Sequence, residues 1–392
     1  MQDPKGPLVR EYVSGKGLTT RLTSGFVIDC NGLDEATLRT KHPREYQWLL
    51  DRVQPVRAHN PRAFKRERWW IFGENQPGMR RAVDGLGRYI ATTETAKHRV
   101  FVFLTGTTLA EGTVCVIGSD DALILGVLSS RAHTAWSLAA GATLEDRPRY
   151  TKTQVFDPFP FPLGTARQND AIRSIAEELD AHRKRQLTTN PKLTMTAVYN
   201  VLETLRAGGA LTEKEQAVHE QGLVSLLSKL HNDLDAAVFD AYGWPPDLTD
   251  EQIVERLVAL NAERSAEELR GTVRYLRPDF QAPKTEVVPT QPTLLPDDEE
   301  ETRPSSSPPP ALPEADRVWP KDYFAQASAV RDLVASLPDG AKFDAGSLDP
   351  HFKGKAPKRV DQIARILSTF AKLGHFVTLA PGLYGRPIRR TA

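Results

Sequence analysis

Apolar positions in residues 1 to about 163 follow two different spacings. Four short runs rich in β-branched and aromatic residues, each bounded by Gly, Asp or Thr, predict the strands Phe26–Cys30, Tyr89–Thr92, Val100–Leu104 and Val114–Ser119. Between them, apolar residues at helical spacing predict one helix over Asp34–Val53 and a largely buried helix over Asp121–Ala140. We therefore expect a mixed α/β domain over residues 1–163.

From about residue 165 to 280 the apolar spacing is helical throughout. One stripe is Ile172, Ile175, Ala176 and Leu179, and a longer one is Leu223, Leu226, Leu227, Leu230, Leu234, Val238 and Phe239. Gly243, followed by Pro245 and Pro246, ends the second helix. Thr249, with Gln252 three residues later, begins the next helix with a capping box. This pattern predicts a helical domain over residues 164–281.

Residues 282–314 lose the periodicity. Nine of these 33 residues are proline, and they include the acidic run Asp297–Glu301. Such a composition predicts a disordered, proline-rich linker, in which the acidic run is a solvated segment rather than a metal site.

A small domain is predicted over residues 315–392. Helical spacing returns over Asp322–Leu337 and Val360–Leu373, and Phe376–Tyr384 has the pattern of a hairpin with its turn at Pro381-Gly382. Two helices followed by a hairpin fit a winged helix and several other small α+β folds. The predicted fold class of the whole chain is therefore α+β, with a small winged-helix-like domain at its C-terminal end.

The overall composition narrows the class of protein. Hydrophobic residues are 40% and charged residues 26% of the chain, which are ordinary globular values. The two cysteines, Cys30 and Cys115, stand in apolar contexts that predict buried, reduced thiols. The N-terminal residues do not form a signal peptide, and no stretch approaches the ~20 apolar residues of a membrane helix. We expect a soluble, cytoplasmic protein with no membrane partner.

The usual catalytic motifs are missing from the sequence. The nearest approach to a phosphate-binding loop is Ser14-Gly15-Lys16-Gly17, which lacks the Walker spacing and, by its pattern, a following helix. No His, Cys, Asp or Glu group has metal-ligand spacing, and neither a Gly-x-Ser-x-Gly elbow nor a restriction-nuclease carboxylate pattern is assembled. The sequence therefore predicts no catalytic, cofactor-binding or metal-binding residue.

Residues 51–100 are basic, with eleven Lys and Arg against five Asp and Glu. Aromatic residues are interleaved with the cations, most densely over Arg62–Trp70. Two interpretations stay open: a DNA-binding face, because Lys and Arg neutralise phosphates, or a solvated face with Trp69 and Trp70 in the core.

The segment Arg149–Pro162 combines cations with three prolines that alternate with aromatic residues. Proline at this spacing predicts an extended strap rather than a helix or a central strand. We expect its Phe-Pro part to pack its rings on a neighbouring domain. Its first part, Arg149–Lys152, is the better candidate for contact with a phosphate.

Several blocks in this order resemble one family. They are Val9–Leu18, Arg66–Gly73, Arg88–Arg99, Leu125–Ser130, Tyr150–Lys152 with Phe156–Pro162, Asp235–Trp244, Leu260–Arg264 and Leu276–Pro278. Over residues 8–280 the chain resembles the C-terminal, target-recognition and helical half of the class I adenine-N6 DNA methyltransferases that depend on S-adenosylmethionine (SAM). These include the MmeI-like type IIL restriction–modification enzymes and the DISARM-type phage-defence methyltransferases.

The resemblance does not extend to the family's catalytic domain, which has a glycine-rich SAM-binding loop and an Asn-Pro-Pro-Tyr/Phe motif. Asn60-Pro61-Arg62 lacks the second proline and the aromatic residue. We therefore expect SAM to bind a catalytic domain outside this chain, and the chain alone to be inactive as a methyltransferase. A fragment, a split-gene product and a degraded relative all fit this pattern.

The resemblance implies sequence-specific DNA recognition in a restriction–modification or phage-defence system. The implied partners are double-stranded DNA and a SAM-binding methyltransferase domain or subunit. The candidate DNA-contacting residues are Lys16, Lys65, Arg66, Arg68, Arg88, Lys97, Arg99, Tyr150 and Lys152. The alternative is a non-catalytic protein-interaction subunit of a phage-defence complex. The basic stretches Lys353–Arg359 and Arg386–Arg390 would suit either DNA or a partner.

Overall fold

The computed structural model of this chain describes residues 6–144, 147–283, 317–320, 322–338, 340–353, 358–373 and 375–386. They belong to two compact units, Met1–Leu248 (unit 1) and Thr249–Ala392 (unit 2). The proline-rich segment lies outside the described residues from 284 onward, as do 354–357 and 387–390 of the two basic stretches. The α+β fold class is confirmed, and the predicted domain boundaries at 163, 281 and 314 stay predictions.

Two small three-stranded sheets form the framework of unit 1. The strands are β1 (Val9–Val13), β2 (Gly25–Ile28), β3 (Arg88–Thr93), β4 (Val102–Thr105), β5 (Leu109–Ala110) and β6 (Val114–Ile117). The first sheet has the order β2-β1-β5 and the second the order β4-β3-β6. In the second sheet both neighbours run antiparallel to β3, and Ile90 lies opposite Phe103 and Ile117. The four predicted strands are thus confirmed, within two residues at each end.

The first 140 residues of unit 1 also contain short helices. They are α1 (Gly15–Thr20), α2 (Glu35–Lys41), α3 (Pro43–Arg52), α4 (Gln54–Arg57), α5 (Ala63–Glu67), α6 (Pro77–Val83), α7 (Ala122–Ser129) and α8 (Arg131–Ala140). The prediction of one helix over Asp34–Val53 is wrong, because the chain leaves helical geometry at His42, where Pro43 begins a second helix. The single helix predicted over Asp121–Ala140 is also wrong. Ser130 is extended there, with φ −78° and ψ 163°.

The prediction for the segment after Tyr150 is partly wrong. A hairpin of β7 (Ala142–Leu144) and β8 (Arg147–Arg149) precedes it, and Lys152–Phe156 then forms a π-helical turn instead of an extended strap. The turn is fixed because the buried indole of Trp136 donates to the Val155 carbonyl over 2.9 Å. In the Phe-Pro part the Phe159 ring is buried, with its centre 4.3 Å from that of His133. The prediction that these rings pack on a neighbouring domain is wrong for Phe159, because His133 belongs to α8 of the same predicted domain.

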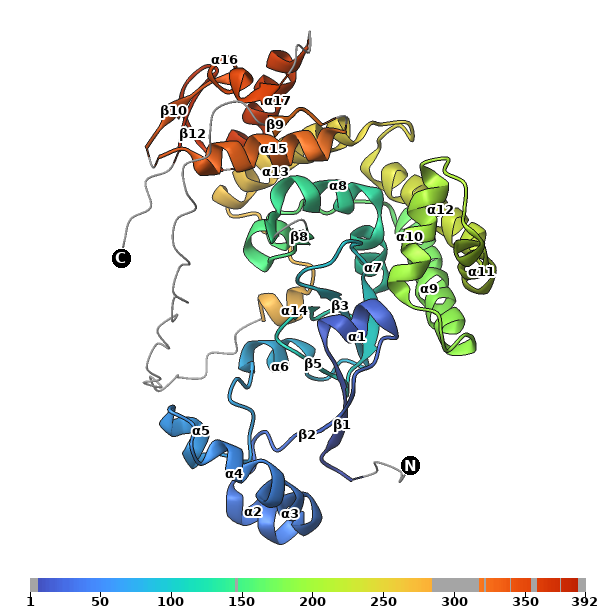
Figure 1. Cartoon of the computed structure of the whole chain (residues 1–392), viewed down its shortest axis with the longest axis vertical. Helices are drawn as coiled ribbons and strands as arrows, with labels where there is room; N and C mark the ends of the chain where they lie inside the picture. Colours follow the sequence, from blue (N-terminus) through green and yellow to red (C-terminus); the bar gives the residue numbers. More distant parts are fainter. Residues whose placement is uncertain are drawn as a thin grey trace. The chain divides into compact units, whose positions relative to one another are not determined.

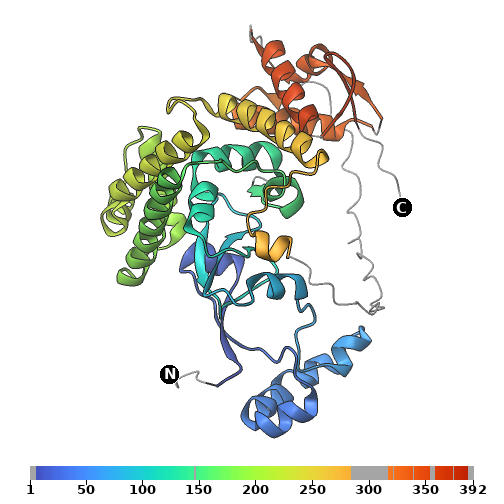
Figure 2. The same cartoon turned by 180° about the vertical axis from the view of Figure 1, so that it is seen from behind.

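Four longer helices complete unit 1, and they lie side by side in both views (Figure 1; Figure 2). They are α9 (Ala166–Thr189), α10 (Met195–Arg206), α11 (Glu213–Gly222) and α12 (Val224–Tyr242). The approach of α7 to α9 requires glycine at position 126. A Cβ atom there would lie 2.6 Å from the Ile172 side chain. The predicted stop at Gly243 is confirmed, with φ +68°.

Two side chains of α9 form hydrogen bonds with backbone groups at the outer edge of β4. The Asp180 carboxylate accepts from the Phe103 amide over 3.2 Å, and the Arg183 guanidinium donates to the Phe101 carbonyl over 2.9 Å. Both side chains are buried. An uncovered strand edge presents unpaired backbone groups, so these two residues join the helices to the sheet.

Unit 2 contains α13 (Asp250–Leu269) and a small domain with the winged-helix order of elements. The capping box predicted at Thr249 is present. The remaining elements are α14 (Pro278–Gln281), β9 (Arg317–Val318), α15 (Tyr323–Ser336), β10 (Lys342–Phe343), α16 (Ala345–Leu348), a 3-10 turn (Asp349–His351), β11 (Phe352–Lys353), α17 (Arg359–Lys372), β12 (Val377–Ala380) and β13 (Leu383–Gly385). The sheet order β10-β13-β12 makes β12–β13 the wing. None of the helices in the described ranges could cross a membrane.

Candidate nucleic-acid interface

The first part of the basic segment, residues 51–71, belongs to a lobe with its own small core, whereas Arg88–Thr93 form β3 of the second sheet. Trp69 is buried there with Cys30, Leu38 and Leu49, and the Trp70 indole donates to the Leu33 carbonyl over 2.8 Å. The interpretation that places both tryptophans in a core is therefore confirmed. Because these two rings pack in the core, they are not available for base stacking. The DNA-binding interpretation therefore applies only to the charged side chains around that core.

Three candidate cations lie on this lobe, Lys65 and Arg66 on the short helix α5 and Arg68 at its C-cap. Arg66 and Arg68 are exposed, and Lys65 is half-buried. The Arg66 guanidinium donates to the carbonyls of Asn60 and Pro61, over 2.7 and 2.9 Å, which closes the loop before the helix. Arg68 stands 5.6 Å from the centre of the Phe64 ring. These contacts hold the side chains but leave their charges facing solvent.

Arg99 and Tyr150 require a correction. Tyr150 is 2% exposed, and its hydroxyl hydrogen-bonds the buried His133 Nε2 over 2.9 Å. The Arg99 guanidinium lies 5.0 Å from the centre of the Tyr150 ring and donates to the carbonyls of Thr93 and Pro148. Burial lowers the pKa of Arg99 to about 10. The predicted DNA contacts of these two residues are wrong for this structure, because their polar groups point inward and bind the chain itself.

This inward cluster holds a loop and a hairpin together. Arg99 bridges the end of β3 to the residue that precedes Arg149 in β8. The Tyr150 amide donates to the Glu94 carbonyl over 2.7 Å. The Glu94 carboxylate in turn pairs with Arg149 at 2.6 Å. Arg99 and Tyr150 are therefore positioning residues for the surface loop Glu94–His98 and the β7–β8 hairpin.

Arg88 is also held by contacts within the protein. Its guanidinium makes two hydrogen bonds to the Glu177 carboxylate, donates to the Asp120 carbonyl and lies 3.7 Å from the centre of the Phe103 ring. Hydrogen bonding to Glu177 raises the pKa of Arg88. A contact of Arg88 with DNA would require this pair to break.

The other predicted contacts are on the surface of unit 1. Lys16 is exposed on α1, and Lys152 is 81% exposed, with its ammonium 3.9 Å from Asp157. Lys97 is exposed in the β3–β4 loop and binds Asn200 and Glu203 of α10, at 3.0 and 2.7 Å. Their contact with DNA stays a prediction, as does that of the α5 cations.

Sequence reasoning missed one ion cluster around a buried carboxylate. Asp29, 6% exposed, accepts two hydrogen bonds from Arg80, over 2.8 and 3.0 Å, and pairs with Arg10 at 3.4 Å. Arg10 and Arg80 stand 19 and 51 positions from Asp29 in the sequence, so no rule of local spacing connects the three residues. The cluster fixes α6 on the β1–β2 hairpin.

The glycine-rich segment Ser14–Gly17 forms the start of α1. The prediction that no helix follows it is wrong, because α1 begins at Gly15. The space beside Gly15 is nevertheless filled by Thr113, whose hydroxyl would lie 2.9 Å from an added Cβ, and Ser24 fills the space beside Gly17. These glycines therefore allow close packing against Thr113 and Ser24. In the described ranges no three His, Cys, Asp or Glu side chains could hold a metal ion.

Comparisons with known proteins place one segment of the chain. The family model of the MmeI target recognition domain matches residues 50–163. DNA methyltransferase A of Bacillus subtilis (strain 168) is 27% identical over 157 residues, which are 40% of this chain and 15% of that protein. The type IIL restriction–modification enzyme MmeI, solved in complex with DNA, has a TM-score of 0.48 and 20% identity, over 66% of this chain and 31% of that chain. This chain thus spans a minor part of both relatives. Residues 50–163 are thus similar to the target recognition domain of MmeI.

Proposed function

We propose that this chain supplies the DNA sequence recognition of an adenine-N6 DNA methyltransferase in a restriction–modification or phage-defence system. Unit 1 binds duplex DNA and positions a SAM-binding catalytic domain that lies outside residues 1–392. That domain supplies the methyl group, and this chain alone does not transfer it. The match of residues 50–163 to the MmeI target recognition domain is the observation that carries the proposal.

The charge arrangement of unit 1 supports a role at DNA. Five candidate cations keep their charges at the surface: Lys16, Lys65, Arg66, Arg68 and Lys152. Arg80, Arg88 and Arg149, by contrast, are paired with Asp29, Glu177 and Glu94. Surface Lys and Arg neutralise phosphates and release counterions, which supplies most of the sequence-independent affinity for DNA. Loops and a hairpin held by a buried cluster are suited to reading base edges, because their positions are fixed before binding.

A salt titration tests this proposal. The full chain should bind a fluorescent duplex with an affinity that falls steeply as salt rises. A variant with Lys16→Ala, Lys65→Ala and Lys152→Ala should lose up to about 3 from the slope of log affinity against log salt, at ~0.9 per phosphate contact. A matched variant with Lys192→Ala, Lys214→Ala and Lys229→Ala, exposed residues of the helical part, should keep the slope. No binding at any salt concentration, or an equal loss in both variants, contradicts the proposal.

The exposed wing of unit 2 favours a second candidate function, a non-catalytic subunit that binds another protein. All four residues of β12 are exposed, including the apolar Val377 and Leu379. Exposed apolar side chains on an edge strand are typical of protein contacts. A chain that binds no duplex at any salt concentration would favour this second function.

A further inference from the structure

The small domain at the C-terminal end of the chain has an excess of positive charge. Residues 315–392 contain thirteen Lys and Arg against seven Asp and no Glu, whereas the formal net charge of the whole chain is +1. Positive charge concentrated in one domain favours the binding of polyanions. This excess lies outside residues 50–163, which match the target recognition domain, so it needs an explanation of its own.

Three of these cations form a line along α17, and we call them the α17 stripe. Lys358 is the N-cap of the helix, Arg365 lies in its middle and Lys372 is its last residue. Because seven residues are close to two helical turns, the three positions share one face at intervals of ~10.5 Å. All three side chains are exposed. The opposite face of α17 is buried in the core of the domain through Ile363, Ile366, Leu367 and Phe370.

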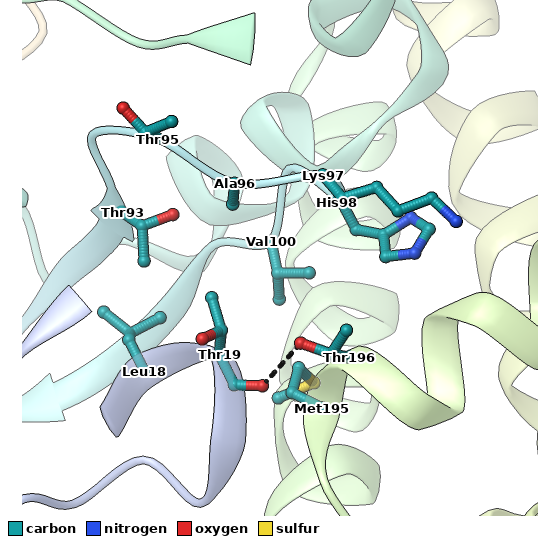
Figure 3. A pocket seen from close by; sticks show the side chains of 10 residues that line it. All are labelled: Leu18, Thr19, Thr93, Thr95, Ala96, Lys97, His98, Val100, Met195 and Thr196. Atoms are coloured by element: carbon teal, nitrogen blue, oxygen red, sulfur yellow. Dashed lines mark hydrogen bonds between the residues drawn. The ribbon is translucent and has the colours of Figure 1, made fainter. Parts of the chain in front are cut away.

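The two outer charges of the α17 stripe are free to bind a ligand. In the part of the chain that the structure describes, the ammonium groups of Lys358 and Lys372 have no hydrogen-bond or ion-pair partner. Lys97, at the rim of a cavity of about 520 Å³ in unit 1 (Figure 3), is different, because its ammonium pairs with Glu203 at 2.7 Å. A phosphate that binds Lys97 must displace that carboxylate, whereas one that binds Lys358 or Lys372 displaces only water.

The middle cation of the stripe, Arg365, is held by an exposed ion pair. Its guanidinium lies 3.4 Å from the carboxylate of Glu251, in the first turn of α13, and the two side chains are 64% and 30% exposed. An exposed pair of this kind contributes little to stability, because water screens both charges, so a phosphate can take the place of Glu251. Asp361 of α17 is also exposed. Three cations against Asp361 leave the face with an excess of two positive charges.

We propose that the α17 stripe is a second contact of this chain with duplex DNA, and that Glu251 competes with a DNA phosphate for Arg365. The phosphates of a duplex form continuous rows, with one negative charge per ~1.7 Å of helix axis. Evenly spaced cations on a straight helix can therefore each meet a phosphate, whereas an acidic protein would need carboxylates at matching intervals. Phosphate contacts hold a protein on the duplex and do not read its sequence. The stripe thus adds affinity, and it acts whether or not unit 1 recognises a target.

A triple variant of the full chain tests the contact. Lys358→Ala, Arg365→Ala and Lys372→Ala together should lower the slope of log affinity for a duplex against log salt by up to about 3, at ~0.9 per phosphate contact. The matched control is the variant with Lys192→Ala, Lys214→Ala and Lys229→Ala, which removes the same charge from exposed positions of unit 1 and should keep the slope. Thermal unfolding shows whether each variant folds, and the exposure of all six side chains favours folding.

A second variant tests the competition for Arg365. Glu251→Gln removes the competing charge, so the affinity for the duplex should rise by roughly twofold to fivefold, the worth of one exposed ion pair. Glu268→Gln removes the same charge from an exposed position of the same helix and should raise the affinity less. In a chain that also carries Arg365→Ala, the two substitutions should have equal effects. A general change in the charge of the chain would not produce this dependence on Arg365.

The outcomes separate this contact from the proposed function. If the variant with Lys16→Ala, Lys65→Ala and Lys152→Ala keeps the wild-type slope while the α17 variant loses part of it, the contact in unit 2 stands and the DNA-binding role of unit 1 fails. A wild-type slope in the α17 variant overturns the second contact, and would leave an acidic partner protein as the ligand of the stripe. Equal gains from Glu251→Gln and Glu268→Gln overturn the competition for Arg365. A chain that binds no duplex at any salt concentration overturns both the contact and the proposed function.

Discussion

The buried hydrogen bond between Tyr150 and His133 gives a sharp prediction, because it separates a positioning role from DNA contact. Tyr150→Phe keeps the ring and removes only the hydroxyl that meets His133 Nε2 at 2.9 Å. The other ring nitrogen, Nδ1, is buried with no partner in the described chain, so the imidazole has no substitute bond. Leaving one buried polar group unsatisfied costs ~1–3 kcal/mol. We expect the free energy of unfolding of unit 1 to fall by about 2 kcal/mol.

Chemical denaturation followed by tryptophan fluorescence measures this change. Five of the six tryptophans, all except Trp319, lie in unit 1, so the signal reports mainly on that unit. Tyr275→Phe is the control, since its hydroxyl is exposed, and it should change stability by less than about 0.5 kcal/mol.

Duplex binding by the folded Tyr150→Phe variant completes the test. Its salt slope should equal that of the wild type, because the Tyr150 hydroxyl does not reach the surface. Unchanged stability together with weaker DNA binding would refute the reasoning, and would restore Tyr150 as a contact residue.

Three other predictions follow from the same contacts. Arg183→Met should destabilise unit 1 by about 2 kcal/mol in chemical denaturation, because the Phe101 carbonyl loses its buried partner; a change below about 0.5 kcal/mol would contradict the role of α9 at the edge of β4. Burial lowers the pKa of His133 to about 3, so protonation favours the unfolded state below its ordinary pKa of ~6.5, and stability should fall by about 1 kcal/mol from this residue between pH ~6.5 and ~5.5. His133→Asn should reduce that loss, and an unchanged pH profile would count against a buried neutral imidazole. Lys152→Ala alone should lower the salt slope of duplex binding by ~0.9, whereas Lys214→Ala should not; equal slopes in both variants would remove Lys152 from the interface.

The regular elements could be predicted where local chemistry decides them. β-Branched runs located four strands of unit 1, and Gly243 and the Thr249 capping box located a helix end and a helix start. The breaks at Pro43 and Ser130 were missed because the apolar spacing continues across them. Pro43 indicates a helix boundary, because a proline disfavours helical geometry at the residue before it. The prediction of one helix relied on apolar spacing and did not use this signal. Ser130 has no such signal, and its extended backbone depends on the packing of α7 and α8.

The candidate site was harder to predict than the fold. Arg99 and Tyr150 stand among surface cations in the sequence, yet the tertiary structure encloses them, and spacing along the chain cannot report that burial. A packing role for the Phe-Pro part could be predicted because prolines restrict the backbone, but the surface that the Phe159 ring meets, α8 of the same predicted domain, could not. The turn at Lys152–Phe156 depends on a hydrogen bond from Trp136, 19 residues before Val155, which no local rule supplies.

The most direct test of sequence recognition is selection from a library of duplexes with randomised centres, using the full chain at a salt concentration that suppresses non-specific binding. The retained molecules are sequenced after repeated rounds. A recognition chain should enrich one short motif, and the Lys192, Lys214 and Lys229 variant should enrich the same motif. Retention without enrichment of any motif would contradict sequence recognition and leave only a general affinity for DNA.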